Sequence, residues 1–292
     1  MAFIDQLKST FRKGSTLAQL IYINVAVFLV LKIVYVFFYL FQIPGIDKIY
    51  TLFSIPADFS TIIKQPWSVI TYMFLHEGFG HIFGNMIVLF FMGRLFLNYL
   101  DGKKLLSTYL IGGLIGGLFF VLAFNIFPSF RQVVGGASAL GASASVMAVM
   151  IAITVIRPNQ DVYLYFLFRV KLKYISIGFI VLDLVSIPRG NPGGHIAHLG
   201  GALYGYLFAA QLVKGKDIST GFGKFMDALA SVFKPRKKIK VTYKKPVDDY
   251  TYNAQKAANQ EEVDRILDKI AKSGYDSLSK KEKEILFQAG KK

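Results

Sequence analysis

The stretch VVGGASALGASASVMAVM, Val133–Met150, decides how the rest of the chain is interpreted. Small residues crowd its first half, and three serines at positions 138, 143 and 145 occur within eight residues, just where an apolar helical pattern begins. A hydroxyl group is costly to bury in an apolar environment unless it is hydrogen-bonded. The serines at the start of this segment therefore need a structural or a chemical reason.

The composition is typical of a membrane protein. Of the 292 residues, 53% are hydrophobic and 15% are aromatic, and the mean hydropathy is +0.44. Soluble domains of this length are rarely so apolar. Because the chain contains no cysteine, disulfides, thiolate chemistry and sulfur-ligated metal sites are excluded. We expect no cofactor and no metal.

Six apolar segments have about the length that crosses a bilayer as a helix. The fold class we expect is an all-α membrane bundle of six helices, in which a short fourth span is surrounded by the others. Residues 1–16 would form a cytoplasmic segment, 17–213 the membrane domain and 214–292 a basic cytoplasmic tail. The predicted spans are Leu17–Phe41, His81–Leu100, Leu105–Phe127, Gly141–Ile156, Leu172–Ile187 and His195–Val213.

The distribution of basic residues predicts the orientation, because short cytoplasmic loops are enriched in Lys and Arg. We therefore expect both termini in the cytoplasm, and spans two, four and six to enter from the outer face. The site they carry would open to that face of a multi-pass protein in the cell (inner) membrane. The basic residues on the expected cytoplasmic side are Lys8, Arg12, Lys13, Lys103, Lys104, Arg157, Arg169, Lys171, Lys173, Lys214 and Lys216.

The tail has a different composition from the spans. Lys234–Lys245 holds seven basic residues in twelve positions, and next to a membrane exit this favours anionic lipid headgroups over nucleic acid. Further on, apolar residues recur with helical spacing, and Ser279 with Glu282 predicts a capping box. We expect a helical hairpin over residues 257–289.

Four histidines and the serine cluster are the candidates for chemistry. The histidines are His76, His81, His195 and His198, at or just before the outer ends of spans two and six. Asn85 follows His81 by four residues, so both project from one helix face. A titratable group at membrane depth indicates function by default, whereas a serine alone in a membrane helix usually bonds a neighbouring carbonyl or joins helices.

Spans four and six carry small residues at their outer ends. Glycines at positions 201 and 205 form a G-x-x-x-G that lets another backbone approach closely, and Ala144 and Ala148 follow Ser143. Such contact would bring the Ser143 hydroxyl toward His198. A serine hydroxyl is a weak nucleophile unless an adjacent base takes its proton, and His198 is the best candidate for that base.

Three motifs in this order resemble the rhomboid family of intramembrane serine proteases: H-x-x-x-N in the second span, G-x-S opening the fourth, and H-x-x-G-x-x-x-G in the sixth. The resemblance covers about residues 17–213. It implies Ser143 as nucleophile and His198 as general base, a dyad without a third carboxylate, with Asn85, His81 and a backbone N–H stabilising the oxyanion. Its substrates would be transmembrane proteins cleaved within the membrane segment.

The sequence departs from the family pattern at two positions near the nucleophile. Ala144 stands where the family often has glycine, and Met147 replaces a tyrosine that packs the histidine ring in some members. The outer end of the fifth span, including Leu182 and Ile187, precedes a Gly- and Pro-rich loop, so we expect it to gate lateral substrate entry.

Two other functions stay open at the level of sequence. The first is a catalytically inactive rhomboid-like membrane chaperone or binding protein. The second is an intramembrane zinc protease that uses His76 and His81, although these are five residues apart, about 140° around a helix. The sequence does not indicate an oligomeric state.

Overall fold

The computed structural model describes residues 14–164, 168–233 and 249–290. The chain divides into two compact units, residues 1–234 and 235–292, and each is described by itself. The basic segment Lys234–Lys245 lies outside the described residues, as does the N-terminal segment up to residue 13.

All six apolar segments predicted from the sequence are helical in the first unit. Four described helices, α2, α6, α7 and α10, are long and apolar enough to cross a membrane. The other two have 14 and 15 residues, which is about 22 Å of helix against a hydrocarbon core of about 30 Å. The six are α2 (Thr16–Leu40), α6 (Phe79–Leu97), α7 (Gly102–Ile126), α8 (Ser143–Ile156), α9 (Leu172–Ser186) and α10 (Pro192–Val213).

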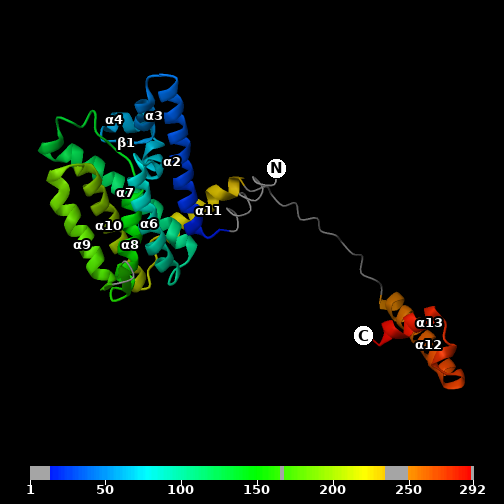
Figure 1. Cartoon of the computed structure of the whole chain (residues 1–292). Coiled ribbons are helices and arrows are strands. Elements are labelled where there is room, and N and C mark those ends of the chain that lie inside the picture. Colours follow the sequence, from blue (N-terminus) through cyan, green and yellow to red (C-terminus); the bar gives the residue numbers. More distant parts are fainter. Residues whose placement is uncertain (1–13, 165–167, 234–248, 291–292) are drawn as a thin grey trace. The chain divides into compact units, whose positions relative to one another are not determined.

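Helix α8 lies at the centre of this unit. Eleven of its 14 residues are buried, and it contacts α6, α7, α9 and α10 (Figure 1). Helix α9 contacts mainly α10 and α8 and lies at the edge of the bundle in Figure 1. The expectation that the short fourth helix is surrounded by its neighbours is confirmed.

Glycine and alanine residues set the spacing of the three central helices. A Cβ atom on Gly201 or Gly205 of α10 would lie 2.1 or 2.3 Å from the carbonyl oxygen of Ala144 or Ala148. Helix α7 approaches the same two alanines from another side through its own glycines at 116 and 112. The close contact predicted from G-x-x-x-G is therefore present, and since 144 meets 201 and 148 meets 205, α8 and α10 run parallel.

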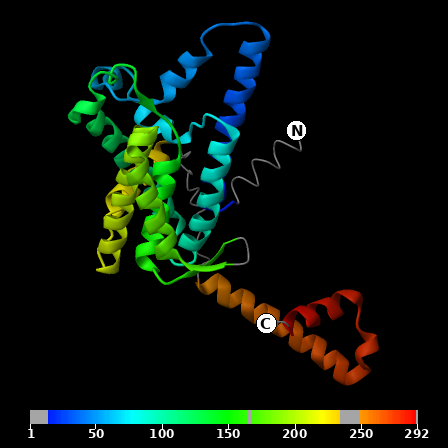
Figure 2. The ribbon, with the colours of Figure 1, turned by 60° about the vertical axis from the view of Figure 1, so that its left-hand side comes forward.

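The connection from α2 to α6 is a folded segment that packs over one end of the bundle. It contains α3 (Ile46–Phe53), β1 (Ile55–Pro56), α4 (Phe59–Lys64), α5 (Ser68–Thr71) and the 3₁₀ turn η1 (Tyr72–Phe74) (Figure 2). Strand β1 pairs antiparallel with β2 (Ser138–Ala139), just before α8. Trp67 donates a hydrogen bond from Nε1 to the Leu52 carbonyl at 2.9 Å, within this segment.

Short elements complete the first unit. Helix α7 is followed by η2 (Pro128–Phe130), and α9 is followed by η3 (Ile187–Arg189). Strands β3 (Asp161–Leu164) and β4 (Phe168–Lys171) form an antiparallel pair between α8 and α9, in which Val162 pairs with Val170. Helix α11 (Thr220–Phe233), which the sequence analysis did not predict, contacts α7 through the ion pair between Asp227 and Lys103 at 2.8 Å.

The second unit is a pair of helices, α12 (Asp249–Ser273) and α13 (Lys280–Ala289), joined through η4 (Tyr275–Ser277). The predicted capping box of Ser279 and Glu282 opens α13. Helix α12 begins at Asp249, eight residues before the expected start of the hairpin. The sequence did not predict its first two turns because they carry no apolar periodicity. Hydrogen bonds from the Ser279 backbone and the Lys269 ammonium lower the pKa of Glu282 to about 2.

Candidate active site

The helix beginnings of α6 and α8 meet around Gly141. Ser143 is the first residue of α8 and is half-buried, and His81 lies in the first turn of α6. A Cβ on Gly141 would lie 2.9 Å from His81 Nε2 and 3.5 Å from Ser143 Oγ, so both side chains border this residue. Gly141 has φ +133°, a conformation that favours glycine, and its N–H donates to the Tyr72 carbonyl at 2.9 Å. Gly141 is therefore both a turn and a point of close approach.

The contact between α8 and α10 brings His198 to the same end. Ala144, directly after Ser143, touches Gly201, which lies three residues after His198. His198 is half-buried in the second turn of α10. Within the described residues, no hydrogen bond joins Ser143 Oγ to His198. The backbones are thus in contact, and Ser143 in the first turn of α8 lies near the second turn of α10, which carries His198.

The other two serines of the cluster have different surroundings. Ser138 is exposed in β2, where it pairs with Pro56. Ser145 is fully buried, and its hydroxyl lies 3.9 Å from the sulfur of Met73. Of the three hydroxyls, that of Ser143 alone is at a helix start and bordered by an imidazole.

Two buried polar side chains next to this group lack partners. Asn85 is one turn after His81 on α6, and its Nδ2 is buried without a hydrogen-bond acceptor. His76 precedes α6, so it does not share a helix face with His81 as a zinc-binding pair would; its ring centre is 5.1 Å from that of His81. Both ring nitrogens of His76 are buried and unpaired. An unpaired buried donor such as Asn85 Nδ2 can serve a bound ligand.

A carboxylate adjoins the histidines of α10, which sequence reasoning missed. Nδ1 of His198 and Nδ1 of His195 each lie 2.8 Å from Oδ1 of Asp183 on α9. The family resemblance implied a pair without a third carboxylate, whereas the structure brings one into hydrogen-bond contact with the candidate base. The available signal was the rarity of an acidic residue in a membrane span. One side-chain atom from each of Asp183, His195 and His198 lies within 4.8 Å of the other two, a grouping that could hold a metal ion.

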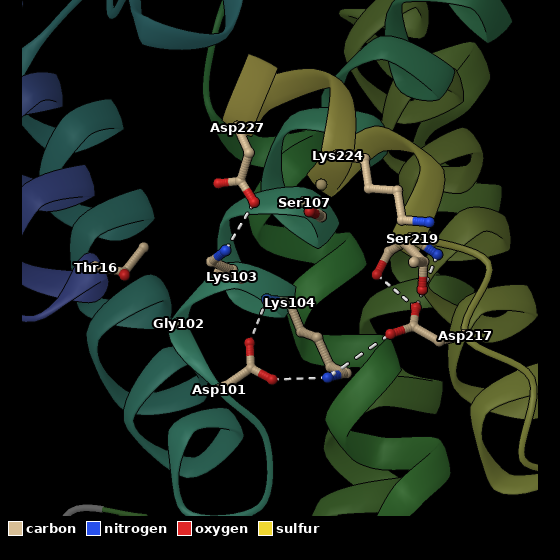
Figure 3. A pocket seen from close by; sticks show the side chains of 12 residues that line it. Thr16, Asp101, Gly102, Lys103, Lys104, Ser107, Asp217, Ser219, Lys224 and Asp227 are labelled. Atoms are coloured by element: carbon tan, nitrogen blue, oxygen red, sulfur yellow. Dashed lines mark hydrogen bonds and ion pairs between the residues drawn. The ribbon is translucent and has the colours of Figure 1, made fainter. Parts of the chain in front are cut away.

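A cavity of about 650 Å³ lies between the start of α7 and the segment that follows α10 (Figure 3). Roughly 22 Å of helix separates His198 from Val213, the end of α10 that lies nearest to this cavity. The cavity is lined by paired charges: Lys103 with Asp227 at 2.8 Å, and Lys104 with Asp101 at 2.7 Å and Asp217 at 3.7 Å. The pairs that Lys103 and Lys104 form with Asp227 and Asp217 join α7 to the segment after α10, so this region has a structural explanation apart from the histidine site.

Two known protein families match parts of this chain. The model of the Rhomboid domain matches residues 64–215, just over half of the chain, and a family of unknown function (DUF6576) matches residues 247–292. RHOMBOID-like protein 12, mitochondrial, from Arabidopsis thaliana is 32% identical over 158 residues, which cover 51% of this chain and 47% of that protein.

The human Presenilin-associated rhomboid-like protein, mitochondrial, is 26% identical over 173 residues, which cover 58% of this chain and 43% of that protein. The matched region therefore spans less than half the length of either relative. The domain match includes α6, α7, α8, α9 and α10, and with them every residue of the candidate site. The chain belongs to the rhomboid family of membrane proteins.

Proposed function

We propose that this chain is an intramembrane serine endopeptidase that cleaves transmembrane segments of other proteins. One observation carries the proposal: Ser143 is the first residue of the central helix α8, and the adjoining ends of α6 and α10 carry His81, Asn85 and His198. A nucleophile, a base and unpaired donors are the parts that acyl transfer requires.

In the proposed mechanism Ser143 Oγ attacks the scissile carbonyl while His198 takes the hydroxyl proton through Nε2. The imidazolium then returns this proton to the leaving amine, and the peptide bond breaks to give an acyl-enzyme. Water, deprotonated by His198, hydrolyses the ester and frees Ser143. The α8 and α10 backbones touch where Ala144 meets Gly201, so the two side chains lie on adjoining parts of these helices.

The oxyanion would be stabilised by Asn85 and His81 together with the amides at the start of α8. No side chain caps α8, and the first N–H groups of a helix have no acceptor within it. Asn85 Nδ2 is a buried donor without a partner. Donors held in place before the reaction need no reorganisation when negative charge develops.

The length of α8 accounts for water at the nucleophile. A helix of 14 residues is about 21 Å long, roughly 9 Å shorter than the hydrocarbon core. If its far end reaches the inner interface, Ser143 starts below the outer surface, shortly after β2, which pairs with β1. We propose that α8 and α9 complete six spans, with a polar cavity above Ser143 admitting water.

The charges around the hairpin of β3 and β4 support an orientation. Four basic residues lie at the end of α8 and α9 away from Ser143, which favours a cytoplasmic location for that end: Arg157, Arg169, Lys171 and Lys173. Both termini would then be cytoplasmic in the cell (inner) membrane. The membrane domain would span residues 17–213 and the cytoplasmic tail 214–292, whose basic segment would attract anionic headgroups.

The proposal is tested with the purified full-length chain and a fluorescent single-span substrate in detergent. We expect Ser143→Ala and His198→Ala each to reduce cleavage by roughly a thousandfold or more, and the double variant to lose little beyond this, because nucleophile and base act as one unit. Ser138→Ala is the matched control and should cleave at the wild-type rate. A serine-reactive fluorophosphonate should label the wild type but not Ser143→Ala.

Each alternative gives a different result. Activity that survives in Ser143→Ala but not in Ser138→Ala would move the nucleophile to Ser138. A folded wild type that neither cleaves nor takes the probe would support an inactive rhomboid-like protein. Inhibition by chelators without probe labelling would support a zinc protease.

A further inference from the structure

The carboxylate of Asp183 sits where a third catalytic component would be. It is almost fully buried on α9, and its Oδ1 lies 2.8 Å from Nδ1 of His198 and 2.8 Å from Nδ1 of His195. Its second oxygen, Oδ2, is buried without a partner. Both hydrogen bonds therefore converge on one oxygen from one direction, that of α10.

We propose that Asp183 is a positioning residue that fixes the tautomer and ring orientation of His198. This inference rests on the proposed function. An ionised carboxylate only accepts hydrogen bonds, so a neutral His198 bonded to it through Nδ1 carries its proton on Nδ1. The lone pair is then on Nε2, the nitrogen that must take the proton of Ser143.

The carboxylate also acts after proton transfer. When His198 holds the proton from Ser143, its ring is a cation in a site of low dielectric, and a negative charge in contact with Nδ1 stabilises it. The proton stays on His198 and passes to the leaving amine. His195 donates to the same oxygen and so helps to hold Asp183 in place, while its own ring is three residues nearer the start of α10.

A purely structural role makes a different prediction. Asp183 joins α9 to α10, so it could serve only to hold the two helices together. In that case the His195 bond and the His198 bond would matter alike, since both are 2.8 Å long and the two histidine side chains are 23% and 22% exposed. His195 is thus a matched control for His198 at the same oxygen.

The test uses full-length Asp183→Asn and His195→Gln. Asn preserves the shape but cannot stabilise an imidazolium, so we expect kcat to fall about 100- to 10,000-fold while KM changes less than about threefold. His195→Gln should lose less than about tenfold in kcat. Thermal unfolding should be similar for the two variants.

A second measurement needs no variant of Asp183. With only four histidines in the chain, ¹⁵N-histidine labelling resolves each ring by NMR. When the His198 ring is neutral, we expect its Nδ1 to be protonated and its Nε2 to be unprotonated.

Specific results would overturn the inference. These are a wild-type kcat in Asp183→Asn, equal kcat losses in both variants, or His198 protonated on Nε2. Loss of activity on chelation that zinc restores would assign the three side chains to a metal instead. If wild type lacks Ser143-dependent cleavage, the proposed function fails as well; if wild type is active and only Asp183→Asn behaves unexpectedly, this inference alone fails.

Discussion

Gly201→Ala tests whether the contact between α8 and α10 sets the catalytic geometry. The new Cβ would lie 2.1 Å from the Ala144 carbonyl oxygen, 2.8 Å from its carbonyl carbon and 3.1 Å from its Cα, all of them backbone atoms that cannot rotate away. A non-bonded carbon and oxygen need more than about 3 Å, so the helices must separate by about 1 Å. Overpacking of this kind costs about 1–3 kcal/mol of stability.

The same displacement acts on the site, because Ala144 follows Ser143 and Gly201 is one turn below His198. A misplacement of about 1 Å between reacting groups can cost about 100-fold in rate, so kcat of Gly201→Ala should fall by about this factor. Cleavage of a single-span substrate and thermal unfolding are measured together. Gly178→Ala on α9 is the control, because nothing lies within 4 Å of its Cβ position. Full activity of Gly201→Ala would refute the reasoning.

Three further results are expected. Asn85→Ala should lower kcat by about 100- to 1,000-fold with KM little changed, as loss of one oxyanion donor does; an unchanged kcat in the cleavage assay would remove Asn85 from the oxyanion site. Because the folded pKa of Glu282 is about 2 against an ordinary 4.5, its contribution to the second unit is complete above pH 4.5 and lost as the pH falls toward 2. Amide exchange in residues 249–290 of the full chain, corrected for intrinsic rates, should rise over this range in wild type and less in Glu282→Gln. Ile180→Ala, which removes packing of α9 against the core, should speed cleavage of a membrane-embedded substrate if α9 gates entry; unchanged or slower cleavage would contradict the gate.

Leu182, one of the two gate residues chosen from the sequence alone, is a poor probe of the gate. Leu182 was expected to hold the outer end of the fifth span, but it is 62% exposed in the protein. Its truncation would change contact with lipid rather than helix packing. The apolar residues of α9 are spread around the helix, so their periodicity does not distinguish the protein-facing side. Ile180 packs on the core and is the better probe.

The sequence predicted the helices and their close contacts because both depend on local patterns. Hydropathy located all six apolar helices, and the spacing of glycines at 201 and 205 predicted the approach of α8 that the structure shows. The same logic placed Ser143 at a helix start and His198 on the facing helix. These inferences needed only the period of a helix and the size of a side chain.

The contact between Asp183 and His198 could not be predicted in this way. The two residues lie on different helices joined by a Gly- and Pro-rich turn, so their distance depends on how α9 leans on α10. The sequence has Met147 where some rhomboid family members have a tyrosine that packs the histidine ring. Met147 is buried and carries no hydrogen-bonding hydroxyl. The carboxylate of Asp183 beside the His198 ring became visible only when the helices were placed in space.

The position of Asp183 on α9, at the edge of the bundle, would link substrate entry to chemistry. Helix α9 is joined to its neighbours by polar contacts near its two ends: Ser176 with Thr154 of α8 at 2.6 Å, and Asp183 with the histidines of α10. If the outer end of α9 moves aside to admit a substrate helix, the first contact can act as a hinge, but the second must break. His198 then loses the acceptor that fixes its tautomer. The base is restored only when α9 returns, so an open gate and a competent His198 exclude each other, and hydrolysis follows closure around the substrate.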